Sequence, residues 1–298
     1  MTDTGESLRR KIGSAGELQA VVRTMKAMAA SSVGQYLDSA RALADYYRTV
    51  ELGLGACFRA SALTAPNGGP KSSRPAVAVR AIVFGSDQGL VGQFNDLVAD
   101  RAIETIGKRA GAAEVWAVGE RVQARLAEAG LKLAGVLAVP HSVQTIAPLI
   151  AQLQVETEAR HPPDDGELWL FHNRPRSGSA YEPVGRRLLP LDSEWQRDLA
   201  NRRWPSARLP QILGGGATTL RALLHEYLFI TLFRACAESL ASENASRMAA
   251  MERAEKNIGE LLEQLQGNFN RLRQSGIDEE LFDVVSGFDA LAGSRRRA

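Results

Sequence analysis

The sequence predicts an α/β protein with long helices: an antiparallel coiled coil of the N- and C-terminal helices, with an α/β domain inserted between them. Two observations carry this prediction. Apolar residues recur at every third or fourth position through two long stretches without proline, one near each end of the chain. Between them, short strand-like runs alternate with helical runs. We expect the first helix in residues 1–60, the inserted domain in residues 75–212, and the second helix with its tip in residues 213–298.

The longest stretch with a helical apolar period is Thr218–Leu272. At ~1.5 Å rise per residue it would form a helix of roughly 80 Å, far longer than most helices of globular proteins. Such a helix needs a partner to cover its apolar seam. The seam consists of Leu220, Leu224, Tyr227, Ile230, Phe233, Ala237, Ala241, Ala245, Met248, Met251, Ala254, Ile258, Leu261, Leu265, Phe269 and Leu272.

The predicted partner is the stretch Ser7–Arg59, which has the same apolar period. Because a folded segment connects the two helices, they must run antiparallel, and they pair as a coiled coil. A helical bundle is the alternative, but it would need more long helices than this chain offers. The first seam consists of Leu8, Ile12, Ala15, Leu18, Val22, Met25, Ala29, Val33, Tyr36, Ala40, Leu43, Tyr47, Val50 and Leu54.

Composition excludes several classes of protein. The net charge of +2 does not favour nucleic acid as a partner, and Arg295–Arg297 is read as a solvated tail. No run reaches the ~20 apolar residues of a membrane span, and the N-terminus lacks the pattern of a signal peptide. Any membrane association is therefore expected to be peripheral.

The cysteines and histidines do not predict a disulfide or a metal site. Cys57 and Cys236 would lie roughly 25 Å apart along a paired coiled coil, too far for a bridge. The four histidines are scattered without the spacing of metal ligands. We expect free thiols and no metal.

The middle of the chain changes character after a Pro- and Gly-rich linker at residues 61–74. Strands are expected at residues 76–84, 114–118, 131–139, 167–171 and 184–191. Helices are expected at residues 90–106, 120–129 and 142–158, the first with Val91, Phe94, Leu97, Val98, Ile103 and Ile106 on its apolar side. This alternation indicates a three-layer, Rossmann-like α/β domain with a largely parallel sheet.

A glycine-rich turn, Gly85–Gly92, follows the first expected strand and opens a helix, which is the context of a phosphate site. Its spacing fits neither the GxGxxG nor the P-loop pattern. We therefore interpret it as a tight turn with glycines in unusual dihedral angles and with Asp87 bonded to nearby backbone.

Catalytic patterns are scarce. Asp164 and Asp165 fall in a loop expected to be solvated, and His172, Asn173 and Arg174 are expected where a strand ends and a loop begins. No GxSxG or CxxC motif is present. The sequence argues against an autonomous enzyme, and no cofactor is expected.

Several blocks resemble the gamma subunit of rotary F-type ATP synthases. Residues 7–32, SLRRKIGSAGELQAVVRTMKAMAASS, resemble that family's first helix with its T-K-A-M-x-x-V-A-A-S core. Residues 241–251, ASENASRMAAM, resemble its A-S-E-x-x-A-R-M-x-A-M block, and residues 270–277 its N-K-A-R-Q-x-x-I block. The turn at residues 84–95 matches S-D-R-G-L-C-G-x-x-N. Ser32, Gln88 and Asp278 depart from the family's usual residues, so a divergent variant from an N-type ATPase stays open beside the housekeeping subunit.

The resemblance implies a central rotor shaft that couples ion flow to ATP synthesis or hydrolysis. It implies alpha and beta subunits in a 3:3:1 particle, an epsilon subunit and a membrane c-ring as partners, and a peripheral place on the cytoplasmic face of the bacterial inner membrane. It also implies rotor–stator contacts, for which the matching positions in this sequence are Met25, Lys26, Arg247, Arg273, Gln274 and Glu280.

The geometry of the predicted helices adds a further expectation. The second helix should extend about 30 Å beyond the first as a single helix. Its apolar residues there are Ile277, Leu281, Val284, Val285, Phe288 and Leu291, which need a surrounding sleeve. Two other readings stay open from the residues: a Rossmann-like enzyme with a helical oligomerisation arm, and a coiled-coil scaffold without energy transduction.

Overall fold

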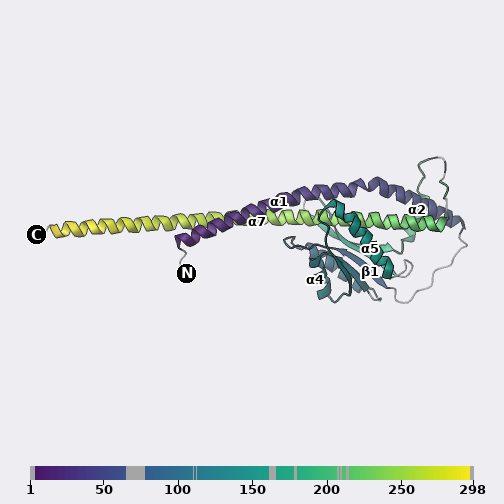
Figure 1. Ribbon diagram of the computed structural model, residues 1–298, viewed down its shortest axis with the longest axis horizontal. Coiled ribbons are helices and arrows are strands. Elements are labelled where there is room, and N and C mark those ends of the chain that lie inside the picture. The colour runs from purple at the N-terminus through teal and green to yellow at the C-terminus, as the bar shows by residue number, and fades with distance from the viewer. Residues whose placement is uncertain are drawn as a thin grey trace. The chain divides into compact units, whose positions relative to one another are not determined.

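The chain forms two compact units, residues 1–28 with 249–298 and residues 29–248. We call them the coiled-coil unit and the α/β unit. Helices α1 (Gly5–Ala42) and α7 (Gly216–Arg295) contribute to both (Figure 1). The computed structural model describes residues 4–64, 78–109, 111, 113–160, 166–177, 180–206, 208, 210–212 and 215–295.

In the coiled-coil unit, α1 and α7 run antiparallel, as predicted. A Cβ atom at Gly5 would lie 3.8 Å from Cδ2 of Leu272. Further along α1, Arg23 donates a 2.7 Å hydrogen bond to Glu255. The residue number thus falls along α7 as it rises along α1, so the direction of pairing is fixed by contacts at both ends.

The seam of the coiled-coil unit differs from the prediction at Leu18, Leu261 and Leu272, which are 57%, 46% and 41% exposed. Ala15 and Val22 are buried as expected. Between them the contact comes from Gln19, whose Nε2 lies 3.7 Å from where a Cβ of Gly259 would be. The seam therefore runs from Ala15 to Gln19 and then to Val22, a step of four residues followed by a step of three. The prediction had placed Leu18 between Ala15 and Val22, a step of three followed by a step of four.

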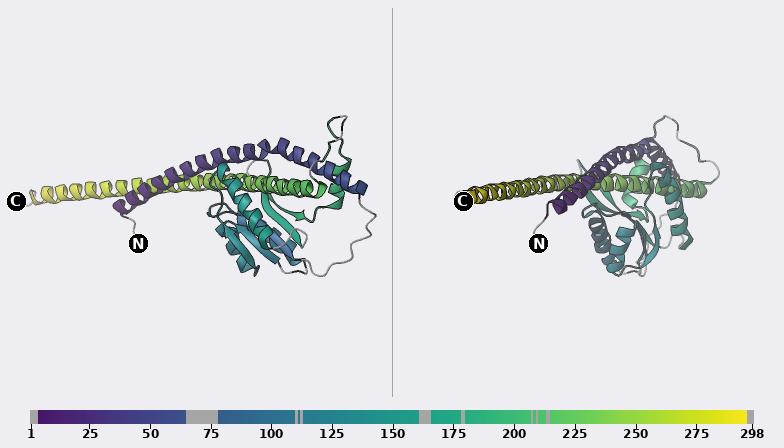
Figure 2. Two further views of the ribbon diagram at one scale, coloured as in Figure 1. Left: turned by 45° about the vertical axis from the view of Figure 1, so that its right-hand side comes forward. Right: turned by 60° about the vertical axis from the view of Figure 1, so that its left-hand side comes forward.

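The α/β unit contains a five-stranded sheet in the order β3-β2-β1-β4-β5. Figure 2 shows this unit from two further directions. The first four strands pair in parallel, and β5 pairs antiparallel with β4. This confirms the largely parallel sheet. The strands are β1 (Val79–Phe84), β2 (Ala113–Val118), β3 (Leu133–Leu137), β4 (Glu167–Pro175) and β5 (Tyr181–Leu189).

Helices cover both faces of this sheet, which gives the predicted three layers. On one face, side chains of β1 and β2 pack with those of α3 and α4, as Ala81 does with Val98 and Val122 in one buried cluster. On the other, Ile82 and Trp116 share a cluster with α5 and with Leu240 of α7. The remaining helices are α2 (Ala44–Thr64), α3 (Phe94–Gly107), α4 (Glu120–Glu128), the 3-10 turn η1 (Val143–Thr145), α5 (Ile146–Arg160) and α6 (Ser193–Asn201).

Several predicted boundaries shift. The first long helix is interrupted at Leu43, and α2 continues through Thr64 into the expected linker. Helix α3 begins only at Phe94, because Leu90 and Gly92 take positive φ angles of 63° and 57° that a helix does not allow. Leu97 was placed on the apolar side of this helix but is 36% exposed.

Helix α6 was not predicted. Asp192 caps it by accepting a 3.0 Å hydrogen bond from the backbone N–H of Glu194. Leu199 of α6 packs in a third buried cluster with Leu54 of α2 and Tyr227 of α7. A Cβ atom at Gly55 would lie 2.4 Å from the carbonyl oxygen of Leu199, so the close approach of α2 to α6 requires glycine there.

Candidate functional site

The end of α7 carries an exposed apolar stripe, in agreement with the predicted tip. Every described side chain from Ile277 to Ser286 is exposed. The exposed fraction is 61% for Leu281, 72% for Phe282 and 70% for Val284. Soluble proteins seldom leave large apolar side chains exposed in one contiguous stripe unless the stripe binds something. The side chains of Phe288 and Leu291 lie outside the described ones.

Three of the predicted contact residues flank this stripe. Arg273, Gln274 and Glu280 are exposed, and each lacks a hydrogen bond or ion pair within the part of the chain that the structure describes. Since positions three, four and seven apart share a helix face, Arg273, Ile277 and Glu280 lie on one side of α7. On this face of the helix, the apolar side chain of Ile277 lies between the cation of Arg273 and the anion of Glu280.

Lys26 and Met25 lie elsewhere in the coiled-coil unit. The Lys26 Nζ is 2.5 Å from Oε2 of Glu255, and Arg23 holds the other oxygen of the same carboxylate. The bond from Lys26, followed by the bond from Arg23, lowers the pKa of Glu255. Met25 is half-buried. Two cations therefore share one carboxylate, a pairing that the sequence alone did not indicate because it depends on the register between α1 and α7.

Arg247 lies in the α/β unit and is largely buried. It donates a 2.7 Å hydrogen bond to Glu243 one helical turn earlier, and the two side chains are 13% and 7% exposed. Burial raises the pKa of Glu243, and the attraction of Arg247 opposes this shift. Arg247 is thus engaged within its own helix, in contrast to Arg273.

The glycine-rich turn is closed by its own side chains. Ser86 and Asn95 bond each other, with the Ser86 N–H donating to Asn95 Oδ1 at 2.9 Å. Asp87 accepts from the backbone N–H groups of Glu120 at 3.0 Å and Val139 at 2.8 Å. The Asp87 carboxylate therefore lies at the N-terminus of α4, and its negative charge disfavours a phosphate group next to the turn.

The predicted character of this turn is confirmed in part. Asp87 does bond backbone, although that backbone belongs to α4 and to the segment after β3. Of the three glycines in the turn, one, Gly92, has a positive φ angle. The second residue of the turn with a positive φ angle is not a glycine but Leu90. Ser246 of α7 donates a 2.6 Å hydrogen bond to the carbonyl of Val91, so the turn is also attached to the long helix.

His172, Asn173 and Arg174 were expected at a strand end but lie inside β4, which continues to Pro175. Strand β5 pairs with them and extends the ladder. His172 Nε2 lies 3.0 Å from Glu238 of α7, and Asn173 donates to the carbonyl of Phe94 at 2.8 Å. These residues connect the sheet with α7 and α3. The predicted pair Asp164 and Asp165 lies outside the described residues.

The described part of the chain adds three findings about other kinds of site. Cys57 and Cys236 are both free thiols, and both are buried. No group of three or more His, Cys, Asp or Glu side chains in this part is arranged to hold a metal ion. No helix there has the length and apolar character needed to cross a membrane.

Comparison with known proteins decides the family. The sequence model of a family described as ATP synthase matches residues 4–291. The chain belongs to the ATP synthase gamma-chain family. It is 28% identical over 295 residues to the ATP synthase gamma chain of Nitrosomonas eutropha, covering 97% of this chain and 99% of that one. It is 28% identical over 306 residues to the gamma chain of Anaeromyxobacter sp., covering 95% and 98%.

Solved structures similar to this gamma-chain family member show the same fold. The rotor of the Euglena gracilis mitochondrial ATP synthase matches with a TM-score of 0.60 and 15% identity over 92% of this chain and 98% of that one. A chain of the OSCP/F1/c-ring structure of the same enzyme matches with a TM-score of 0.66 and 15% identity, covering 98% and 95%. The family match favours the shaft reading over the enzyme with an oligomerisation arm.

Proposed function

We propose that this chain is the central rotor shaft of an F-type ATP synthase and couples transmembrane ion flow to ATP synthesis or hydrolysis. One observation carries the proposal: the exposed apolar stripe that Ile277, Leu281 and Val284 form on α7. Family membership supplies the context in which such a stripe has a use.

The stripe stabilises the shaft only when it is covered. Burying apolar surface contributes roughly 25 cal/mol per Å², so several large side chains together represent a substantial gain for a complex that encloses them. A ring of three alpha and three beta subunits around α7 would enclose all sides of a single helix. We infer a 3:3:1 particle with this segment in its central channel.

The α/β unit has a different part in the proposal. We assign residues 75–212 to a foot that meets the epsilon subunit and the membrane c-ring, and residues 1–60 and 213–298 to the shaft and its tip. The complex would then be peripheral, on the cytoplasmic face of the bacterial inner membrane. The chain itself would be non-catalytic, which is consistent with a glycine-rich turn whose Asp87 carboxylate is bonded to the backbone of Glu120 and Val139.

We expect the six proposed rotor–stator residues to differ in how much they contribute to contacts with the surrounding subunits. Arg273, Gln274 and Glu280 are exposed beside the apolar stripe, so they are free to bond a surrounding subunit. A guanidinium bonded to a carboxylate in a channel that excludes water forms a strong, charge-assisted contact. Lys26 and Arg247 already have carboxylate partners, and Met25 offers apolar contact only. We therefore expect smaller roles for these three.

Assembly in vitro tests the proposal. The full chain is mixed with purified alpha and beta subunits, and the product is analysed by size-exclusion chromatography and native mass spectrometry. A 3:3:1 particle is expected. As a matched control, the variant with Ile277→Ser, Leu281→Ser and Val284→Ser keeps the length of the helix and removes the apolar stripe, so it should yield much less of this particle. Separate elution of the unmodified chain would contradict the proposal.

A further inference from the structure

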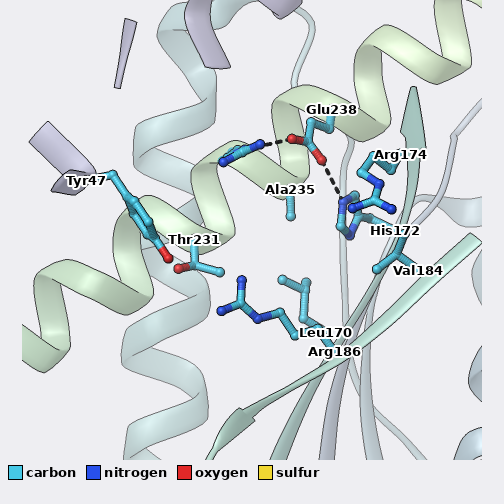
Figure 3. Close-up of a pocket in the computed structure, with 10 residues that line it drawn as sticks. Tyr47, Leu170, His172, Arg174, Val184, Arg186, Thr231, Ala235 and Glu238 are labelled. Carbon is cyan, nitrogen blue, oxygen red and sulfur yellow. Dashed lines mark hydrogen bonds and ion pairs between the residues drawn. The ribbon is translucent and has the colours of Figure 1, made fainter. Parts of the chain in front are cut away.

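A cavity of about 230 Å³ lies in the α/β unit between the sheet and α7 (Figure 3). Its walls come from four elements, β4, β5, α7 and α2. Alternate residues of β4 and β5 supply the sheet side, one face of α7 supplies the other, and Tyr47 of α2 closes the end. The lining residues are Tyr47, Leu170, His172, Arg174, Val184, Arg186, Thr231, Arg234, Ala235 and Glu238.

Basic groups predominate around this cavity. Arg174, Arg186 and Arg234 line it, together with His172, and Glu238 is the one carboxylate among the residues that line it. Glu238 is neutralised within the wall, because it accepts a 2.7 Å hydrogen bond from Arg234 and pairs with His172.

The next carboxylate does not remove the excess of positive charge. Glu182 pairs with Arg174 but also with Arg176, which lies outside the cavity. The residues that line the cavity therefore include three guanidinium groups, those of Arg174, Arg186 and Arg234, and one carboxylate, that of Glu238. The lining carries an excess of two positive charges.

Arg186 is the group with unused binding capacity. Among the described residues it makes one hydrogen bond, a 2.8 Å bond to the hydroxyl of Tyr227, and has no carboxylate within ion-pair distance. A guanidinium carries five N–H donors in a planar fork, so most of those on Arg186 lack a protein acceptor. A second unused group is Nδ1 of His172, which is buried without a partner, on a side chain only 9% exposed.

From these groups we infer that the cavity is a binding site for a phosphate group with at least two anionic oxygens, held by Arg186 and Arg234. Planar guanidinium forks match such oxygens in bidentate geometry. The cavity has room for a polyatomic anion, since one water molecule takes only about 30 Å³ in the liquid. This site is separate from the glycine-rich turn, where Asp87 repels phosphate.

Pyrophosphate is the soluble probe. Isothermal titration calorimetry of the full chain in 150 mM NaCl should show a single site, and Arg186→Gln should weaken binding by roughly tenfold or more, the loss expected for a charged hydrogen bond. Arg187→Gln is the matched control. Neighbouring strand residues point to opposite faces of a sheet, so this variant removes the same charge away from the cavity and should leave the affinity unchanged.

A second arm separates a soluble ligand from a lipid headgroup. Flotation with phosphatidylcholine vesicles, with and without phosphatidic acid, is compared for the same variants. Pyrophosphate binding that Arg186→Gln removes supports a soluble ligand, and vesicle binding alone with the same loss supports a headgroup. Should Arg186→Gln unfold, as judged by near-ultraviolet circular dichroism, the exposed Arg234→Gln takes its place. The inference is overturned if neither probe binds, or if binding survives the cavity variants while Arg187→Gln weakens it.

Discussion

Helix α7 has one apolar period but two environments. In the α/β unit, from Tyr227 to Ser246, it is buried on several sides, and even the hydroxyl groups of Thr231, Ser242 and Ser246 are inside and hydrogen-bonded. In the coiled-coil unit, Met251 is the one buried residue among the side chains described from residue 249 onward. The apolar period therefore indicates that a helix has an apolar side. Whether the polar residues between the apolar ones are buried shows how completely other elements surround the helix.

Two carboxylates on this helix show the same contrast. Glu243 in the α/β unit is buried with Arg247, and burial raises its pKa. Glu255 in the coiled-coil unit accepts from Lys26 and Arg23 at the surface, and these bonds lower its pKa. In a buried ion pair, the loss of hydration can outweigh the attraction of the cation, so the pKa of the carboxyl group rises. In an ion pair in contact with water, the attraction of the cation prevails and the pKa falls.

Removal of residues 276–298 should have the largest effect of the changes considered. It should impair assembly or coupling through the coiled-coil unit and leave the stability of the α/β unit unchanged. Assembly with alpha and beta subunits or coupling in the assembled complex should be strongly reduced, because the apolar stripe is lost. Unfolding of the α/β unit followed by tryptophan fluorescence should be unchanged, since Trp116, Trp169, Trp195 and Trp204 all belong to that unit. Wild-type assembly and coupling by the truncated chain would show that the stripe has no such role.

A matched pair of leucines tests how differently α7 is enclosed. Leu240 is buried in the α/β core and Leu261 is 46% exposed. Leu240→Ala should lower the free energy of unfolding by about 2–5 kcal/mol, because it removes buried methyl groups and leaves a cavity. Leu261→Ala should change it by less than about 0.5 kcal/mol. Urea unfolding measures both, by tryptophan fluorescence for the first and by circular dichroism at 222 nm for the second. Equal costs would abolish the contrast between the two environments.

Arg273 tests the contact proposed for the tip. Arg273→Ala and Gln274→Ala should lower the ATPase turnover or coupling of the purified complex, and Arg273→Glu should lower it further because the reversed charge repels a carboxylate partner. The subunit ratio should stay the same.

Arg253→Glu is the control for net charge, since Arg253 is also exposed on α7 but lies far from the tip in sequence. Unchanged turnover in the Arg273→Glu complex would remove Arg273 from the list of contacts.

The smallest expected effect is a difference in pH dependence. Because the folded-state pKa of Glu243 is raised, the folded chain binds more protons than the unfolded chain just above the usual carboxyl range, and stability falls as pH rises through that window. The pKa of Glu255 is lowered, so its contribution is present above the usual range and is lost as pH falls through the lowered pKa.

The measurement compares melting temperatures of the wild type with Glu243→Gln and with Glu255→Gln between pH 3 and pH 7. On lowering the pH, the wild type should gain relative to Glu243→Gln and lose relative to Glu255→Gln. Trends of the same sign for both variants would show that the two carboxylates have similar surroundings.

The sequence was sufficient for the coiled coil and the largely parallel sheet, because both follow from periods that persist over many residues. It was less informative where the same residues serve two purposes. Ala241 is a predicted seam residue but lies in a buried cluster with Trp116 of the sheet. Ser242 and Ser246 were given no role by the sequence, yet they bond the backbone of Asn173 and Val91.

The candidate site divides in the same way. The exposure of the tip follows from the length of α7 and from its resemblance to the gamma-chain family, so it was predictable. The pairing of Lys26 with Glu255 was not, because a one-step error at Leu18 already moves the register of α1. The basic cavity was also hidden, since it combines β4, β5 and α7, and His172 was expected to lie beyond the end of its strand.

The edges of the sheet affect how the protein behaves at high concentration. An unpaired strand edge is a template for intermolecular β-pairing. Here β3 has only five residues and a register irregularity beside it, between Val115 and Trp116. Strand β5 contains Pro183, which has no N–H to donate, and the adjacent charges of Arg186 and Arg187. Both edges are thus poor templates, which protects the free chain from aggregation before it meets its partners.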